Sequence, residues 1–354
     1  MRGGKVRVLI VDDSALVRQL LSRGLAMDPD IEVVGTAADP YEARDKIVEL
    51  EPDVLTLDVE MPRMDGVDFL RRLMPQYPIP VLMVSSLTQR GKQITLEALD
   101  AGAVDFVSKP STDVARGLTG MLQELRTKVK LTSRANVSHW KGKRPVAAGP
   151  TKAAPVRALA ESTDKVIAIG ASTGGTEAIR KMLVDFPVAM PGVVIVQHMP
   201  AGFTKMFADR LNQLCAMEVK EAETGDRVMP GRVLIGPGGK HMRVVRSGGI
   251  YLVECTPGDP VSGHCPSVDV LMHSVARHVG ANALGVMLTG MGADGADGML
   301  AMRRSGARTL AQDEASSVVF GMPKVAFEKG GAERLVPLEQ MTSAVIELLS
   351  KRIS

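Results

Sequence analysis

The chain contains 354 residues, which is too many for one typical hydrophobic core and favours two domains. Its 45% apolar and 23% charged residues are typical of an ordinary globular protein. A net charge of +3 and an aromatic content of only 3% argue against nucleic acid or a membrane surface as the main partner.

The sequence has no feature that is typical of a secreted or membrane-spanning protein. Its first residues run directly into a strand-like stretch, unlike a signal peptide. Its apolar runs are shorter than the roughly 18–20 residues that span a bilayer. We therefore expect a cytoplasmic protein with no direct membrane insertion. Three cysteines, an odd number without metal-ligand spacing, fit reduced thiols in that compartment: Cys215, Cys255 and Cys265.

The first 130 residues alternate between short β-branched runs and helical patterns. Alternation of this kind predicts βαβ units around a parallel sheet, so we expect a five-stranded doubly wound α/β domain over residues 1–130. The expected strands are Val6–Val11, Glu32–Ala37, Val54–Leu57, Val81–Val84 and Val104–Val107.

Residues 131–163 have the composition of a linker. Alanine, proline, glycine, serine and basic residues replace the periodic pattern. A flexible, solvated basic linker is the simpler interpretation, and a patch for nucleic acid or an acidic partner is the alternative. Trp140 could anchor this stretch on a domain.

Residues 164–354 return to alternating strands and helices, which predicts a second doubly wound, Rossmann-like domain with a largely parallel sheet. The expected helices are Thr176–Leu183, Phe203–Leu214, Val268–His278 and Leu338–Leu349. The expected strands are Val166–Ile169, Val193–Gln197, Arg232–Ile235, Ala283–Leu288 and Thr309–Gln312.

Polar residues follow several strands of the first domain. Because the carboxyl ends of parallel strands share one edge, these side chains should converge there. Three carboxylates repel one another without a cation, which points to Mg²⁺ and its preference for oxygen ligands. A carboxylate beside Mg²⁺ can take a phosphoryl group, whose oxygens a serine and a lysine could bind. The residues concerned are Asp12, Asp13, Asp58, Ser85, Ser86 and Lys109.

Segments 8–15 (VLIVDDSA), 57–66 (LDVEMPRMDG) and 106–110 (FVSKP) resemble the receiver domains of two-component response regulators. The resemblance implies that Asp58 is the phosphoacceptor and that a histidine kinase is its phosphodonor. It also implies a metal site and a phosphate-responsive switch. The implied metal ligands are Asp12, Asp13, Asp58 and the backbone carbonyl of Glu60, and the implied switch residues are Ser85, Phe106 and Lys109.

In the second domain, a glycine-rich turn follows the first expected strand. The order Gly170, Ser172, Gly174 is a G-x-S-x-G spacing, in which glycines permit a tight turn that exposes the serine hydroxyl. The helix that follows offers unpaired N–H groups for an oxyanion. The same turn equally suits an anion-binding loop, although the stronger nucleotide motifs are missing.

A histidine and an acid also stand after strands of this domain. His198 follows Val193–Gln197, and Asp294 lies in the glycine-rich turn after Ala283–Leu288. Together with Ser172 they could form a triad in the order Ser, His, Asp, which is not the α/β-hydrolase order. Asp297 competes as the acid, although its place in a helical stretch favours solvent exposure. His241 and His264, expected in loops, compete as the general base.

Segments 168–176 (AIGASTGGT), 197–200 (QHMP), 288–295 (LTGMGADG) and 320–323 (FGMP) resemble the chemotaxis protein-glutamate methylesterase, the CheB family. The resemblance implies a catalytic triad of Ser172, His198 and Asp294, without a metal or other cofactor at that site. It also implies an oxyanion hole of backbone N–H groups, at Met291 and Thr173.

The same resemblance implies a function. The enzyme would hydrolyse glutamate methyl esters, and deamidate glutamines, on methyl-accepting chemotaxis receptors. Phosphorylation of the receiver would activate it, because the unphosphorylated receiver covers the active-site edge in this family. Two other readings of the sequence are a transcription regulator, which would need a basic helix-turn-helix after the linker, and a regulatory domain that binds phosphate or nucleotide.

Overall fold

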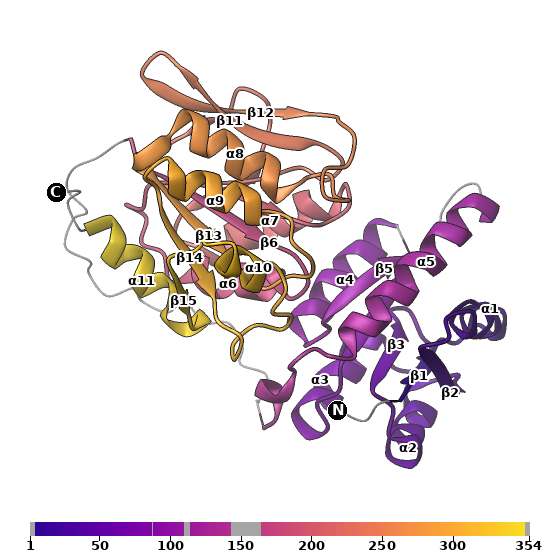
Figure 1. The fold of residues 1–354 in the computed structure, drawn as a ribbon. Helices are drawn as coiled ribbons and strands as arrows, with labels where there is room; N and C mark the ends of the chain where they lie inside the picture. The colour runs from indigo at the N-terminus through magenta and orange to yellow at the C-terminus, as the bar shows by residue number, and fades with distance from the viewer. Residues whose placement is uncertain (1–3, 87, 110–113, 143–163, 351–354) are drawn as a thin grey trace. The chain divides into compact units, whose positions relative to one another are not determined.

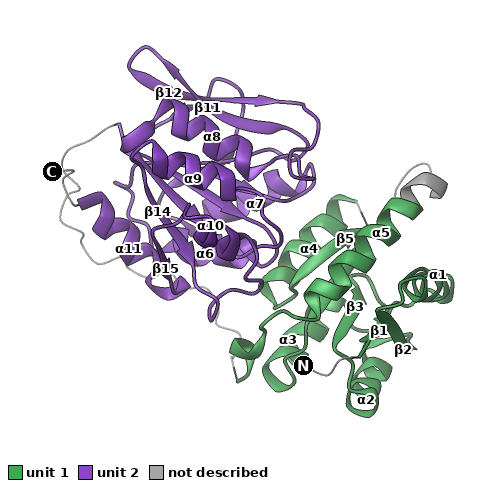
Figure 2. Ribbon diagram, in the orientation of Figure 1, with its two compact units in different colours: residues 1–147 green, residues 148–354 purple. Residues whose placement is uncertain are grey.

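A computed structural model of the chain describes residues 4–86, 88–109, 114–142 and 164–350. The chain divides into two compact units, residues 1–147 and 148–354 (Figure 2). Residues 143–163, most of the expected linker, lie outside the described residues. Within the described part, no helix is long and apolar enough to cross a membrane.

Unit 1 is a five-stranded parallel sheet flanked by helices, in the order β2-β1-β3-β4-β5 (Figure 1). Buried side chains of α1 and α5 pack together with those of β1 in one apolar cluster. Its strands are β1 (Val6–Val11), β2 (Ile31–Ala37), β3 (Val54–Asp58), β4 (Val81–Ser85) and β5 (Asp105–Ser108). Its helices are α1 (Ala15–Ala26), α2 (Pro40–Leu50), α3 (Gly66–Gln76), α4 (Gln89–Asp100) and α5 (Val114–Thr132).

All five strands expected in the first domain are confirmed, with ends shifted by one residue at most. The first turn after β1 shows why α1 begins where it does. Ser14 precedes α1, and its hydroxyl accepts a hydrogen bond from the Val17 N–H, which satisfies one of the free donors at the helix start.

The residues directly after α5 pack back on the rest of unit 1. They include a short 3₁₀ helix, η1 (Ser138–Trp140). A Cβ added to Gly102 would lie only 3.1 Å from the Trp140 ring, so that ring rests against the Gly102 backbone. The N–H of Gly142 also donates to the carbonyl of Pro75. The first part of the expected linker, with Trp140, therefore belongs to unit 1.

Unit 2 contains a seven-stranded sheet in the order β15-β14-β13-β6-β7-β10-β8, in which every neighbouring pair is parallel. The chain starts in the middle at β6 and winds out in both directions. Its strands are β6 (Val166–Ala171), β7 (Gly192–Gln197), β8 (Glu218–Glu221), β10 (Arg232–Ile235), β13 (Ala283–Met287), β14 (Arg308–Gln312) and β15 (Arg334–Val336). Its helices are α6 (Gly175–Val184), α7 (Phe203–Leu214), α8 (Val268–His278), α9 (Ala296–Arg304), α10 (Met322–Glu328) and α11 (Leu338–Ser350), with a 3₁₀ turn η2 (Gly280–Asn282).

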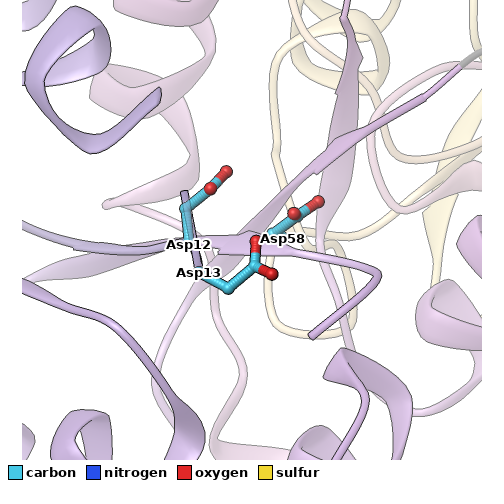
Figure 3. Close-up of side chains that lie close together, drawn as sticks. All are labelled: Asp12, Asp13 and Asp58. Atoms are coloured by element: carbon cyan, nitrogen blue, oxygen red, sulfur yellow. The ribbon is translucent and has the colours of Figure 1, made fainter. Parts of the chain in front are cut away.

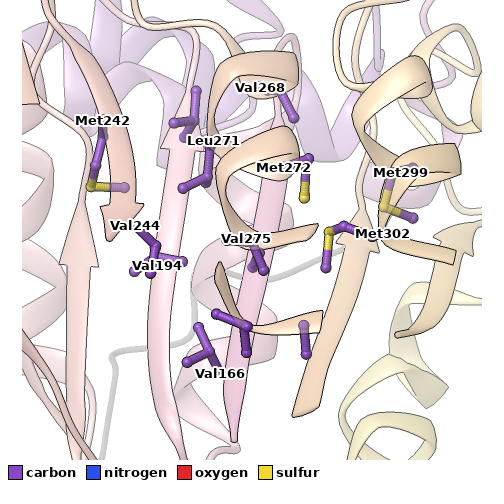
Figure 4. Packing of buried hydrophobic residues seen from close by; sticks show 14 of the residues in the cluster. Val166, Val194, Met242, Val244, Val268, Leu271, Met272, Val275, Met299 and Met302 are labelled. Atoms are coloured by element: carbon purple, nitrogen blue, oxygen red, sulfur yellow. The ribbon is translucent and has the colours of Figure 1, made fainter. Parts of the chain in front are cut away.

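Helix α8 is the central packing element on one face of this sheet. Its apolar residues Leu271, Met272 and Val275 are fully buried and point toward the strands, with methionines of α9 beside them (Figure 4). At about 25 cal/mol per Å² of apolar surface, each such side chain stabilises the fold by roughly 1.5–3 kcal/mol. This packing fixes the position of the α8 N-terminus, which becomes important for the site.

The sequence interpretation missed part of unit 2. Strands β8 and β15 are short sheet strands, and a separate antiparallel sheet joins β11 (His241–Ser247), β12 (Ile250–Thr256) and β9 (Arg227–Val228). Strand β12 alternates between buried and less buried residues, and charged residues lie in both strands of the hairpin. The expectation that His241 lies in a loop is wrong, because it is the first residue of β11.

Candidate functional site

Three carboxylates meet at the carboxyl ends of β1 and β3 in unit 1. Oxygen atoms of Asp12, Asp13 and Asp58 all lie within 4.8 Å of one another (Figure 3). The Lys109 ammonium, from the end of β5, lies 3.0 Å from a carboxylate oxygen of Asp12 and 3.0 Å from one of Asp58. The parallel sheet thus brings residues that are up to 97 positions apart to one point.

The charges at this point are unevenly balanced. Burial raises the pKa of Asp58 to about 6, although the Lys109 charge opposes that rise. Burial disfavours the charged form of Lys109, but the carboxylates of Asp58 and Asp12 outweigh it and raise the pKa of Lys109. One ammonium faces three acids, and the donor atoms are hard oxygens. The residues therefore fit a divalent metal ion.

The expected switch residues differ in their contacts. Lys109 touches the acids directly. Ser85 is fully buried, and its hydroxyl bonds with Thr95 at 2.6 Å and with the Gly91 carbonyl at 3.2 Å, both on α4. Phe106 is also buried. Glu60 is exposed and lies 3.9 Å from Arg90, while the role of its backbone carbonyl stays a prediction.

In unit 2, the three residues expected to act together follow three neighbouring strands. Ser172 follows β6, His198 follows β7, and Asp294 lies in the turn after β13. The order of the strands changes direction between β6 and β13, and open α/β sheets form their sites at such a point. All three residues therefore lie along one edge.

The backbone of Ser172 is held firmly. Its N–H donates to the Thr289 carbonyl at 3.0 Å, and its carbonyl accepts from the Gln197 side chain at 2.9 Å. Gly174, the residue directly before α6, has a φ of +77°, which glycine adopts without strain. A Cβ added to Gly290 would lie 2.8 Å from the Ser172 Cβ. The close packing of Gly290 against Ser172 therefore fixes the position of this serine.

His198 and Asp294 form a direct pair. The Nε2 atom of His198 lies 2.8 Å from Asp294 Oδ2, and both side chains are almost fully buried. The start of α8 supplies three more donors to this carboxylate: Ser267 Oγ at 2.8 Å, the Val268 N–H at 2.7 Å and the Asp269 N–H at 3.1 Å. The carboxylate thus accepts four hydrogen bonds.

These contacts determine the protonation states. Burial acts to raise the pKa of Asp294, but His198 and the donors at the start of α8 outweigh it, so the pKa of Asp294 is lowered. An ionised carboxylate only accepts hydrogen bonds, so His198 carries its proton on Nε2. In a neutral imidazole, Nδ1 then carries the lone pair that can accept a proton. That atom is buried and has no hydrogen-bond partner within the described part of the chain.

Ser172, the third residue of the expected triad, follows the strand next to that of His198, but among the described residues its hydroxyl is not bonded to the imidazole. The backbone N–H of His198 donates to the backbone carbonyl of Ala171, the residue before Ser172, at 3.1 Å. Within residues 164–350, no hydrogen bond joins the Ser172 hydroxyl to His198. Relay contacts are often long before substrate binds, so this geometry is compatible with a relay.

The expected oxyanion donors lie beside the serine. Thr173 is buried, and its carbonyl accepts from the Thr289 hydroxyl at 3.0 Å. Met291 follows Gly290, whose backbone touches Ser172. In residues 164–350, no acceptor is bonded to the Met291 N–H. Their roles stay predictions.

The rival residues have other contacts. His241 is buried, and its ring accepts from the Ser267 N–H and donates to the Asp259 carbonyl. Asp297 is exposed and pairs with Lys329, as its helical position predicts. His264 lies with its ring stacked on His198.

Sequence reasoning missed the residues that support the pair. Ser267 is the N-cap of α8 as well as a donor to Asp294, and a serine directly before a helical run is a recognisable signal. Gln197 stands in the sequence simply as the residue before His198. Nothing in the sequence points to its bond with the Ser172 carbonyl, since that bond depends on the pairing of β6 with β7.

Known protein families match both units of the chain. The family model "CheB methylesterase" matches residues 167–345, and "Response regulator receiver domain" matches residues 8–117. The chain is 76% identical to the protein-glutamate methylesterase/protein-glutamine glutaminase of Syntrophotalea carbinolica, covering 98% of this chain and 99% of that one. It is 54% identical to the protein of the same name from Salmonella typhimurium, covering 98% and 97%.

A solved structure matches unit 2 in particular. The crystal structure of the Thermotoga maritima CheB methylesterase catalytic domain aligns with 53% of this chain and all of that one, with 36% identity and a TM-score of 0.52.

The fold and its two sites thus define a response regulator, in which a receiver domain is joined to a second α/β domain that carries an enzyme site. The serine, the histidine–aspartate pair and the sequence matches specify the class further. The chain belongs to the CheB methylesterase family. Membership of this family, with its methylesterase domain, excludes the reading of the chain as a DNA-binding transcription regulator.

Proposed function

We propose that this chain hydrolyses glutamate methyl esters on chemoreceptors and deamidates their glutamines, with Ser172 as nucleophile, His198 as general base and Asp294 as the orienting acid. The observation that carries the proposal is the state of His198. One ring nitrogen is held by an ionised carboxylate, and the other is buried and has no hydrogen-bond partner in the described part of the chain. A buried acceptor without a partner is costly, so such an atom calls for a functional reason.

The proposed chemistry is acyl transfer to water. Nδ1 of His198 takes the Ser172 proton as Oγ attacks the γ-carbonyl carbon. The tetrahedral intermediate collapses, the C–O bond to the methoxy group breaks, and His198 returns the proton to the departing methanol. Water then attacks the glutamyl ester of Ser172, with His198 again as base, and releases free glutamate. With a glutamine substrate, ammonia leaves in place of methanol.

Two further groups would assist this step. The N–H groups of Met291 and Thr173 would bind the oxyanion, and removal of one such donor typically costs about 10²–10³ in rate. Asp294 would stabilise the imidazolium that forms on His198, since it is ionised and lies 2.8 Å from Nε2. No metal or other cofactor is part of this proposal for unit 2.

In unit 1, Asp58 is the proposed phosphoacceptor and a chemotaxis histidine kinase the proposed phosphodonor. An Asp58 oxygen would attack phosphorus as the P–N bond of the phosphohistidine breaks. Mg²⁺ is the proposed ion, held by Asp12, Asp13, Asp58 and the Glu60 carbonyl, and it would neutralise charge on the phosphoryl oxygens. Lys109 and Ser85 would then bind the phosphoryl group, for which the Ser85 hydroxyl must exchange its present bonds to α4.

The proposed compartment is the cytoplasm. All three cysteines, Cys215, Cys255 and Cys265, are free. Burial raises the pKa of Cys215 and of Cys255 to about 11, which keeps both as unreactive thiols at neutral pH. Free thiols of this kind suit a reducing environment.

Phosphorylation is proposed to relieve inhibition by the receiver. A tether of this length keeps two domains at about millimolar effective concentration, so a weak contact suffices to inhibit. A fragment that begins at Asp164 should therefore release methanol faster than the unphosphorylated whole chain. A small phosphodonor should accelerate the whole chain but neither the fragment nor Asp58→Asn. Equal rates for fragment and whole chain would refute the inhibition.

The central test measures methanol release from methylated receptor membranes by the whole chain. Ser172→Ala should abolish release and also prevent labelling by a fluorophosphonate, which reacts with activated serines. His198→Ala should abolish release as well, while His273→Ala, on the exposed side of α8, should not. Full turnover by Ser172→Ala would end the proposal.

A further inference from the structure

A second histidine lies flat against His198. The rings of His198 and His264 have their centroids 3.7 Å apart and an interplanar angle of 14°. The His198 side chain is only 7% exposed, so the stacked ring covers one of its faces rather than sitting at a solvent-exposed edge. His264 itself is partly buried.

The loop that carries His264 is built to hold it still. Val261 and His264 exchange both backbone hydrogen bonds at 3.0 Å, around Ser262 and Gly263, which have φ values of +53° and +81°. Two positive φ angles in succession are the mark of a tight type I′ turn. The Ser262 hydroxyl also donates to the buried Asp269 carboxylate at 3.3 Å, which ties the turn to α8.

The rest of the loop is fixed by His241. Its Nε2 donates to the Asp259 carbonyl at 2.9 Å, before the turn. Its Nδ1 accepts from the Ser267 N–H at 3.2 Å, after the turn. Both ring nitrogens are therefore used to fasten the loop, on either side of His264. The same Ser267 donates through its hydroxyl to Asp294, so loop and catalytic pair share an anchor.

His198 needs such a support. Its bond to Asp294 fixes one ring atom, but the torsion about the Cβ–Cγ bond of histidine is broad, so the ring plane can still tilt. A small tilt would move Nδ1 away from the serine more than it moves Nε2, because Nδ1 lies farther from the Cβ–Cγ axis. A flat ring at stacking distance blocks this rotation and keeps water off that face.

We infer that His264 is a positioning residue for His198: its stacked ring holds the imidazole plane in which Nδ1 can accept the Ser172 proton. The inference rests on the proposed roles of Ser172 and His198. The reaction depends on the flat ring of His264 and not on one of its protons. Since His264 acts on the base and not on the substrate, its loss should lower kcat and leave KM unchanged.

Two variants separate the ring from its polarity. His264→Phe keeps a flat ring but has no nitrogen, and His264→Asn keeps a polar group but has no ring. In whole chain treated with a phosphodonor, we expect kcat of His264→Asn to fall about 10- to 100-fold, the range typical of a misplaced catalytic group. We expect His264→Phe to stay within about threefold of wild type. KM should be unchanged in both, and the melting temperature should stay close to that of wild type.

The outcomes are distinct. Equal kcat values for His264→Asn and wild type would overturn the inference. An equal loss of kcat in His264→Phe and His264→Asn would also overturn it, because that result would mean that a nitrogen of His264 takes part. If His264→Asn unfolds early, the rate of fluorophosphonate labelling in His264→Phe decides, because its folded site must label at nearly the wild-type rate. Turnover by Ser172→Ala would instead reject the proposed function itself, whatever the His264 variants do.

Discussion

Asp294→Asn exchanges one carboxylate oxygen for an NH₂ group in a site where every neighbour is a donor. Oδ1 accepts from Ser267 Oγ and the Asp269 N–H, and Oδ2 accepts from His198 Nε2 and the Val268 N–H. Whichever way the amide turns, a buried backbone N–H faces another donor. Leaving one such group unpaired costs about 1–3 kcal/mol, so the variant should lose that much stability.

The catalytic loss is larger. If NH₂ faces His198, the imidazole must accept at Nε2 and carry its proton on Nδ1, where it can no longer receive the Ser172 proton. If oxygen faces His198, the tautomer survives but the charge that stabilises the imidazolium is gone. The first case lowers kcat by an amount on the order of 10⁴, as a wrong tautomer does in other triads. KM should change little.

The assay is methanol release by phosphodonor-treated whole chain, together with urea denaturation. Asp297→Asn is the matched control, because Asp297 lies three residues away, is exposed and pairs with Lys329 at the surface. It should change stability by about 1 kcal/mol or less and leave kcat intact. An Asp294→Asn enzyme that keeps kcat within tenfold of wild type would refute the assigned role of this carboxylate.

Two further predictions concern the turn at the serine and the acid site of the receiver. In Gly290→Ala the new Cβ would lie 2.8 Å from the Ser172 Cβ and 3.0 Å from its nitrogen. The displaced serine should label with fluorophosphonate about 10²-fold more slowly, whereas Gly249→Ala, with no atom within 4 Å of the new Cβ, should label normally; equal labelling of both would contradict the close-packing argument. In EDTA, the raised pKa of Asp58 means that the folded chain holds a proton that the unfolded chain has lost. The free energy of unfolding of wild type, compared with that of Asp58→Asn, should therefore fall by roughly 3 kcal/mol as the pH rises from about 4 to about 6. Urea denaturation measures this difference, and parallel pH curves for the two proteins would disprove the shift.

The sequence alone predicted the doubly wound α/β class of both units and supplied the candidate residues, but not the antiparallel sheet of unit 2. Alternating apolar runs and helical patterns identified β1 to β5, and polar residues placed after the strands pointed to one edge of each sheet. This works because a parallel sheet aligns the carboxyl ends of its strands whatever the length of the connections between them. Asp12, Asp58 and Lys109 could be grouped on that ground, and they do meet.

The tertiary structure alone decided how the second group is assembled. Three contacts join distant parts of the chain. Asp294 rather than Asp297 meets the imidazole of His198, and the start of α8 supplies three donors to Asp294. His264 stacks on His198. They depend on where α8 packs: Val268 fills the space beside Gly170 and Gly295, where a side chain would collide with it. Periodicity along the chain reports which face of a helix is buried, but the place of its first turn over the sheet is set by shape complementarity between segments that the sequence pattern treats as independent.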